Sequence, residues 1–272
     1  MKAILLNADS DLGWTARYCA ALPLARAFDG HVLCVQNTPF AETRDRFFGY
    51  YPYPEIAAEL HEQDRQHRLR AEERLRHDGI EWDWLESSDG PAQTLLWRSR
   101  LADLTIVTSD GYDRDDLGTD ALVLAGTLAI HARGPILAVP ADLAAFDPLG
   151  TAVIAWNGSP EAASALRQGL PLLGRARNVS LVAVAEEGAS EPPFTAGEAV
   201  KYLARHGVHC EDHGWDRGDG PVAEVVLDAA AALKADYIVA GAYGHTRMRE
   251  AILGGTTRAL LRNSLIPLLM AH

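Results

Sequence analysis

The stretch "ADYIVAGAYG", residues 235–244, has a counterpart earlier in the same chain, "ADLTIVTSDG" at residues 102–111. Both begin with Ala-Asp, continue as an apolar run of strand length and end in glycine. Two more pairs follow the same order: "KAILLN" (2–7) with "AVIAWN" (152–157), and "DGP" at 89–91 with "DGP" at 219–221. Three matches in one order indicate a duplicated unit, and its length is that of a domain rather than of a solenoid repeat.

Strands and helices alternate around both stretches. Alternation of this kind predicts right-handed crossovers and a parallel sheet covered on both faces. The expected strands are 3–7, 31–36, 81–87, 104–109 and 136–140, then 152–157, 179–185, 208–215, 237–241 and 267–271. The expected helices are 15–28, 55–77, one after Gly90-Pro91, one near 121–132, then 160–173, one near 196–205, one after Gly220-Pro221 and one after the glycine loop.

These elements predict two tandem α/β domains of doubly wound, Rossmann-like type, each with a five-stranded parallel sheet and helices on both faces. We place the first domain at residues 1–140, a linker at 141–150 ("ADLAAFDPLG") and the second domain at 151–272. The short apolar end strands, "ILAVP" and "PLLMA", are expected to pair, which would make the chain an intrachain pseudo-dimer; a homodimer is left open. The aromatic segment "RFFGYYPYP" (46–54) is interpreted as the cover of a cleft or as a subunit contact.

Composition narrows the class of function. Apolar residues make up 48% and charged residues 23% of the chain, as in ordinary globular proteins. The net charge of −12 argues against a nucleic-acid partner, which requires a basic face. We find neither a targeting segment nor an apolar run of membrane-spanning length, and the three cysteines lack CxxC spacing, so we expect a cytoplasmic protein with reduced thiols and no membrane partner.

The loop that follows "YIVAG" carries the most specific signal. Its glycines are spaced Gly241-x2-Gly244-x9-Gly254, and Gly255, Thr256 and Thr257 open the next helix. Glycines at the carboxyl end of a parallel strand let backbone N–H groups approach phosphate oxygens, and the dipole of the following helix favours an anion at the same place. The spacing therefore predicts a phosphate cradle.

With this spacing the second half resembles the universal stress protein family, whose members share the HUP-type fold and carry a G-x2-G-x9-G-[Ser/Thr] nucleotide-binding motif after the fourth strand. The resemblance extends over nearly the whole chain as two tandem domains, although the motif is intact only in the second. It implies an adenine nucleotide, ATP or a relative, with or without Mg²⁺. Asn157 stands where the family usually has Asp, and Gly255 stands where it usually has Ser or Thr. The residues implied to line adenine and ribose are Ala155, Trp156, Asn157 and Val184, and those implied to hold ribose and phosphates are Gly241, Gly244, Gly254, Gly255, Thr256 and Thr257.

Three charged or titratable residues of the loop have more than one interpretation each. Arg247 and Arg249 are phosphate clamps or solvated loop residues, and His245 is a phosphate donor, a base or neither. Asn157 is a ribose ligand or a cap of the next helix. The loop has no lysine, so P-loop phosphoryl transfer is not expected.

The first half does not repeat the cradle. Thr108 replaces the first glycine, and the loop "SDGYDRDDLGTD" (109–120) carries five aspartates against one arginine. Carboxylates this close repel a triphosphate. We expect a structural role for this half, or an uncharged or cationic ligand.

The histidines of "HGVHCEDH" (206–213) do not predict a metal site, because His209 and His213 on one extended strand lie too far apart to share an ion. The sequence thus favours a stress-response regulator that binds an adenine nucleotide in its second domain. The alternatives are a slow ATPase or other nucleotide-dependent enzyme on the same fold, and an interaction module without a ligand.

Overall fold

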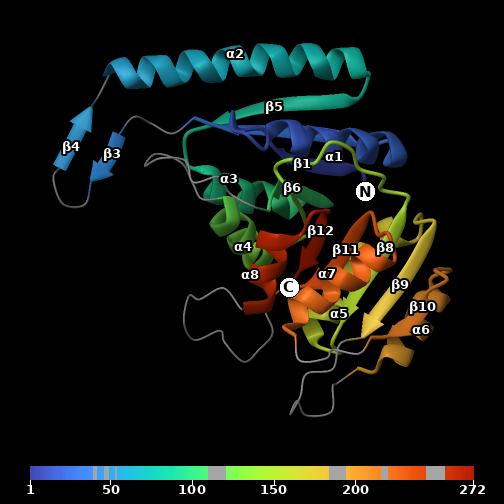
Figure 1. The fold of residues 1–272 in the computed structure, drawn as a ribbon. Coiled ribbons are helices and arrows are strands. Elements are labelled where there is room, and N and C mark those ends of the chain that lie inside the picture. Colours follow the sequence, from blue (N-terminus) through green and yellow to red (C-terminus); the bar gives the residue numbers. More distant parts are fainter. Residues whose placement is uncertain are drawn as a thin grey trace.

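The computed structural model describes residues 1–38, 42–45, 49–52, 54–109, 121–183, 194–215, 220–242 and 255–272; in residues 42–57 it describes the backbone only. One sheet of ten strands runs through the molecule, in the order β10-β9-β8-β11-β12-β7-β6-β1-β2-β5 (Figure 1). The first half contributes β1 (Ala3–Asn7), β2 (His31–Asn37), β5 (Glu81–Ser87), β6 (Leu104–Thr108) and β7 (Ile136–Val139). The second half contributes β8 (Thr151–Trp156), β9 (Asn178–Ala183), β10 (Glu211–Gly214), β11 (Tyr237–Gly241) and β12 (Leu268–Ala271).

Within each half the five strands are parallel and have the same spatial order. Numbered by their order in each half, the strands lie as 3-2-1-4-5, so the first strand sits between the second and the fourth. The predicted α/β fold with parallel strands is confirmed. This order creates a point in each half, between the first and fourth strands, where the chain changes direction across the sheet.

Helices cover both faces of the sheet. One hydrophobic cluster packs residues of α1 (Trp14–Phe28), α2 (Pro54–Asp78), α5 (Pro160–Leu173) and α6 (Ala196–Arg205) against one face. The other cluster packs α3 (Pro91–Arg98), α4 (Ala121–His131), α7 (Val222–Ala232) and α8 (Gly255–Asn263) against the opposite face, and a short 3₁₀ turn, η1 (Ser99–Leu101), follows α3. Each half supplies two helices to each face, so both faces of every central strand are buried.

The two halves meet through their end strands. β7 pairs antiparallel with β12, with Ala138 opposite Leu268 and Ile136 opposite Met270, so the expected pairing of end strands is confirmed. All four residues of each strand are buried. Helices α4 and α8 pack against each other over this junction, and the Arg175 guanidinium donates to the carbonyl oxygen of Ala27 across it. Pairing here removes two exposed sheet edges.

The segment expected to be a linker, residues 141–150, packs against the second half. Phe146 packs edge-on against the Tyr237 ring, with 6.0 Å between centroids. Asp147 Oδ2 forms an ion pair of 3.0 Å with Arg177, and the backbone N–H of Arg177 donates to Leu149 and Gly150.

Two expectations need correction. The segment expected as a loop before α2 contains a two-stranded antiparallel sheet, β3 (Glu42–Asp45) and β4 (Gly49–Pro52), whose Thr43 and Tyr51 are partners. The strand expected over 208–215 is only four residues long, because its register with β9 begins at Glu211. None of the described helices is both long enough and apolar enough to cross a bilayer.

Candidate functional site

The candidate site of the second half lies at the carboxyl ends of β8 and β11. The strands are neighbours, with Ala240 opposite Ala155, so the next residues, Gly241 and Trp156, also lie side by side. This is the point of the second half at which strand order reverses, where ligands of doubly wound proteins bind. The sheet therefore brings together two parts of the predicted site that are about eighty residues apart in sequence.

The turn after β8 is built by side-chain caps. Asn157 Oδ1 accepts from the backbone N–H of Ser159 at 3.1 Å, and Gly158 has the positive φ of +71° that favours glycine. Ser159 Oγ accepts from the N–H of Ala162 at 3.1 Å and caps α5. The helix cap is therefore Ser159 and not Asn157. Asn157 is exposed, and its Nδ2 donor is directed to no described residue, so it is available to a ligand.

Gly241 has a packing reason of its own. A Cβ at this position would lie 2.5 Å from the backbone nitrogen of Ala162 and 2.6 Å from the carbonyl carbon of Glu161. Contacts of this length to backbone do not occur, so the first turn of α5 fits against the end of β11 only because residue 241 has no side chain. The first glycine of the motif thus sets how closely α5 approaches the end of β11.

Glu161 and Trp156 lie on either side of the turn after β8, and each is nearly buried. Glu161, in the first turn of α5, is 4% exposed, and its backbone lies against the end of β11. Trp156 is 5% exposed, and its indole Nε1 has no hydrogen-bond partner in the part of the chain that the structure describes. A buried indole N–H normally finds an acceptor, so this donor favours a ligand or loop atom at the strand end.

The amino terminus of α8 is exposed at the same edge of the sheet, because α8 precedes the parallel strand β12 and must begin at the carboxyl edge. Gly255 and Thr256 are exposed, whereas Thr257 is 5% exposed and packs inward. A Cβ added at Gly255 would meet no atom within 4 Å. The first N–H groups of α8 are thus accessible to an anion, which is the property that the glycine loop predicts.

The described residues also include a histidine that sequence reasoning missed. The His272 ring donates from Nδ1 to the carbonyl oxygen of Ala242 at 2.8 Å, directly after β11. Six predicted site residues lie outside the described residues: Val184, Gly244, His245, Arg247, Arg249 and Gly254. Ala155, half-buried, lies on β8 beside Ala240.

The corresponding crevice of the first half, between β1 and β6, is filled by a side chain. Arg17 of α1 is 1% exposed, and its guanidinium donates to the carbonyl oxygen of Asn7 at 2.7 Å and to Thr108 Oγ1 at 2.6 Å. It also forms an ion pair with Asp11 at 2.8 Å and donates to the carbonyl oxygen of Asp9 at 2.9 Å. Arg17 thus bridges the ends of β1 and β6, and the residue of the second half that corresponds to Thr108 is Gly241.

A second polar group lies at the ends of β1 and β2. Asp9 Oδ1 accepts from the backbone N–H of Asn37 at 2.6 Å and from its Nδ2 at 3.2 Å. Loss of water around the Asp9 carboxylate raises its pKa from 3.8 to about 6, although the hydrogen bonds from Asn37 and the charge of Arg17 oppose the shift. Sequence reasoning missed Asp9 and Arg17, because one lies in a loop rich in polar residues and the other in an otherwise ordinary helix.

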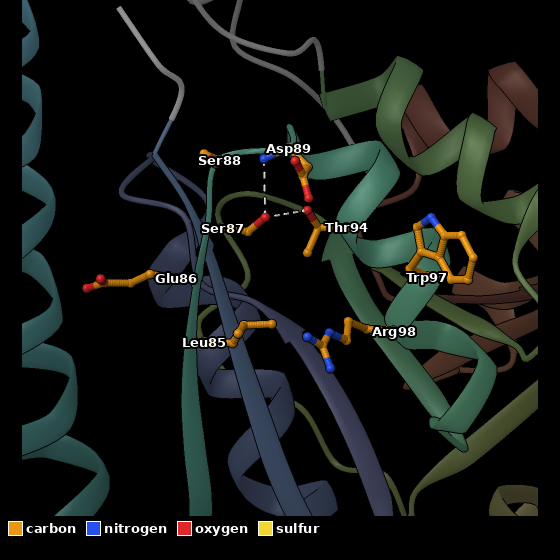
Figure 2. Close-up of a pocket in the computed structure, with 8 residues that line it drawn as sticks. All are labelled: Leu85, Glu86, Ser87, Ser88, Asp89, Thr94, Trp97 and Arg98. Carbon is orange, nitrogen blue, oxygen red and sulfur yellow. Dashed lines mark hydrogen bonds between the residues drawn. The ribbon is translucent and has the colours of Figure 1, made fainter.

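A groove of about 570 Å³ lies elsewhere, at the edge of the sheet (Figure 2). The last residues of β5, the two residues after it and residues of α3 line it. Ser87 Oγ and Thr94 Oγ1 are 2.8 Å apart, and Ser87 Oγ accepts from the N–H of Asp89 at 3.2 Å. It belongs to the first half and shares no residue with the β8–β11 crevice. Its hydroxyls are satisfied by each other, so we assign it no ligand.

A parallel sheet of order 3-2-1-4-5 with a crevice at the reversal of strand order defines a doubly wound α/β protein. Residues 149–272 match the model of the universal stress protein family.

Solved structures support the same fold. A universal stress protein from Archaeoglobus fulgidus superimposes with a TM-score of 0.71 over 98% of this chain and 97% of its own, at 16% identity. A putative universal stress protein from Pseudomonas aeruginosa gives a TM-score of 0.59 over 100% of this chain and 93% of its own, also at 16% identity. Both relatives span the two halves, which fits a tandem arrangement. No curated protein matches the chain.

Proposed function

We propose that the second half of this protein binds an adenine nucleotide, ATP or a relative of it, and that the protein acts as a stress-response regulator through the bound state. The proposal includes the division of the chain into domains 1–140 and 151–272 with a linker at 141–150. The same strand order in each half and the attachment of the linker to the second half support this division.

The observation that carries the proposal is the convergence of three accessible features at one edge of the sheet. These are the free Nδ2 donor of Asn157 after β8, the crevice at the end of β11 beside Gly241, and the open amino terminus of α8 at Gly255 and Thr256. Donors in all three places suit an anionic ligand with hydroxyl groups, as a nucleotide is. The loop 243–254, with its two further glycines and two arginines, joins β11 to α8.

A regulatory role is favoured over catalysis by the chemistry of the motif. The glycine loop has no lysine to neutralise a developing phosphate charge, and Glu161 adds a negative charge in the first turn of α5. A nucleotide bound in this site, with or without Mg²⁺, is not hydrolysed, and the fraction of protein that is occupied follows the nucleotide concentration. We also propose that the protein acts in the cytoplasm.

The first experiment identifies the small molecule released when the purified full-length protein is denatured, and then measures ATP binding by titration calorimetry. We expect one nucleotide per chain, because Arg17 fills the first crevice. Two equivalent sites would contradict the assignment of the first half. Rapid turnover of the bound nucleotide would support the enzyme alternative, and no binding would support the interaction module.

A matched pair of glycine variants tests the cradle itself. Gly244→Val places a branched side chain where an amide must approach phosphate, and loss of two charge-assisted hydrogen bonds, at about 1.5–3 kcal/mol each, weakens binding more than about a hundredfold. Gly111→Val, at the matching position of the first half, is expected to leave ATP affinity unchanged. If Gly244→Val folds by circular dichroism and binds ATP as the unaltered protein does, the loop is only a turn.

A further inference from the structure

We propose that the first half carries a second ligand site, at the carboxyl ends of β1 and β2, which takes an organic cation with N–H donors, such as a primary ammonium or a guanidinium group. Its recognition groups are the Asp9 carboxylate and the Asn37 side-chain carbonyl. This proposal does not depend on nucleotide binding in the second half.

The polar cluster around Asp9 carries a net negative charge. Asp9 and Asp11 supply two carboxylates, and Arg17 supplies one guanidinium, which leaves one net negative charge in a partly buried cluster. Arg17 pairs with the Asp11 carboxylate, whereas it reaches only the backbone oxygen of Asp9. The Asp9 carboxylate therefore has hydrogen bonds from Asn37 but no ion-pair partner among the described residues.

Nearby titratable groups do not cancel this charge. Burial lowers the pKa of His67, so its ring is neutral at pH 7. Asp64 and Arg70, the other charged groups of α2 that act on His67, have opposite signs. A partly buried charge without a partner is costly, and a cation bound beside it removes that cost.

The side chain of Asn37 supplies a hydrogen-bond acceptor without a partner among the described residues. Asn37 is 6% exposed, and its Oδ1 has no hydrogen-bond partner in the part of the chain that the structure describes. The Nδ2 of the same carboxamide donates to Asp9 Oδ1 at 3.2 Å, so the unused carbonyl belongs to the side chain that contacts the carboxylate. A carboxylate and an unused amide oxygen on two side chains in contact suit a ligand with several N–H donors.

An aromatic cluster lies along the same edge. The Trp14 and His67 rings meet edge to face with 4.9 Å between centroids, and Trp84 lies 6.3 Å from each of them. His67 Nε2 donates to the carbonyl oxygen of Ala8 at 3.1 Å. Since Ala8 directly precedes Asp9, this hydrogen bond holds the aromatic cluster near Asp9. Aromatic faces next to a carboxylate favour organic cations, because the ring quadrupole attracts positive charge.

The donor set fits an organic cation better than a metal ion. The described residues contain no group of three or more histidine, cysteine, aspartate or glutamate side chains that is able to hold a metal. Mg²⁺ and Ca²⁺ require six or more oxygen ligands, whereas this site offers one carboxylate and one amide oxygen. A primary ammonium needs only two or three acceptors.

The test measures binding of butylammonium to the full-length protein by calorimetry, with and without ATP. Butanol is the uncharged probe and tetramethylammonium is the cation without N–H donors. Asp9→Asn keeps an oxygen that accepts from Asn37 but removes the charge. We expect butylammonium to bind the unaltered protein, with a loss of about tenfold or more in Asp9→Asn, and no change in the control Asp142→Asn, which removes an exposed charge.

Three outcomes overturn the proposal: equal binding of butylammonium by Asp9→Asn, binding of butanol or tetramethylammonium as tight as that of butylammonium, or no binding of the amine at all. Binding of Mg²⁺ in place of the amine overturns the class of ligand. Asp9→Asn is expected to fold, since it removes a partly desolvated charge. Because butylammonium binding is measured both with and without ATP, the result for the cation site does not depend on whether the second half binds a nucleotide.

Discussion

Arg17 donates a 2.6 Å hydrogen bond to the hydroxyl of Thr108 and thereby closes the crevice of the first half. Thr108 occupies the position that Gly241 has in the second half. A Cβ on Gly13, at the start of α1, would lie 2.3 Å from Thr108 Oγ1, just as a Cβ on Gly241 would collide with the start of α5. In both halves a glycine allows the start of a helix to pack against the end of a strand. In the first half this glycine is Gly13, at the start of α1, and in the second half it is Gly241, at the end of β11.

The Arg17 cluster is predicted to stabilise the first half. Arg17→Met removes hydrogen bonds to Asn7, Asp9 and Thr108 and leaves the Asp11 carboxylate without its partner, so we expect a loss of about 2–4 kcal/mol in the free energy of unfolding. Urea denaturation measures it. Arg26→Met, which removes an exposed ion pair with Asp78, is the control and should cost less than about 1 kcal/mol. Equal effects of the two variants would show that the buried cluster has no special role.

Two glycines of the same motif should respond differently to alanine. Gly241→Ala forces a Cβ against the backbone of α5, and we expect a loss of about 1–3 kcal/mol in stability. Gly255→Ala adds a methyl group to open space at the start of α8 and should change stability by less than about 0.5 kcal/mol. Thermal unfolding followed by circular dichroism compares them. A destabilised Gly255→Ala would mean that contacts beyond the described residues constrain α8.

Glu161 is predicted to limit affinity for highly charged nucleotides. Glu161→Gln removes the charge of a buried residue in the first turn of α5 while it keeps the shape, and we expect ATP to bind about threefold to tenfold more tightly and adenosine to bind unchanged. Glu224→Gln, in the exposed first turn of α7, is the matched control. Tighter binding of adenosine as well as ATP would indicate a change in shape instead of charge.

Asp9 should make stability depend on pH. Because its folded pKa is about 6 and its ordinary value is 3.8, the folded state binds the proton more tightly than the unfolded state does. Its contribution to stability is therefore favourable at low pH and is lost as pH rises from about 4 to above 6. Asp9→Asn should remove this dependence and, after allowance for partial exposure, raise stability at pH 7.5 by about 1–2 kcal/mol. Parallel urea titrations at pH 5 and 7.5 test it; an unchanged pH profile would contradict the assignment.

The pairing of β7 with β12 predicts that the second half does not remain a monomer by itself. Residues 141–272 expressed alone would expose the edge of β12, whose partners are Ile136, Leu137 and Ala138. We expect dimers or aggregates in size-exclusion chromatography with light scattering, and a one-to-one complex on coexpression with residues 1–140. A stable, soluble monomer would argue that the end strands are not needed to complete the fold.

The alternating pattern and the repeated stretches were sufficient to predict the α/β class, the elements of the sheet and the pairing of the end strands. Strand length was less predictable: Val208 to Cys210 have the composition of a strand, yet the register with β9 excludes them. The pair β3–β4 was missed, because the proline and tyrosines of β4 are as typical of a loop as of a short edge strand.

Local sequence by itself determined most of the strands and helices of the main sheet and where a glycine motif stands, because hydrophobic periodicity and glycine spacing are properties of a continuous segment. Only the tertiary structure decided what those glycines and charges do. Gly241 proves to accommodate the backbone of α5, Ser159 rather than Asn157 caps that helix, and Arg17 reaches Thr108 across ninety-one positions of sequence. Contacts of that kind depend on the distance between elements after folding, and no periodicity along the chain encodes that distance.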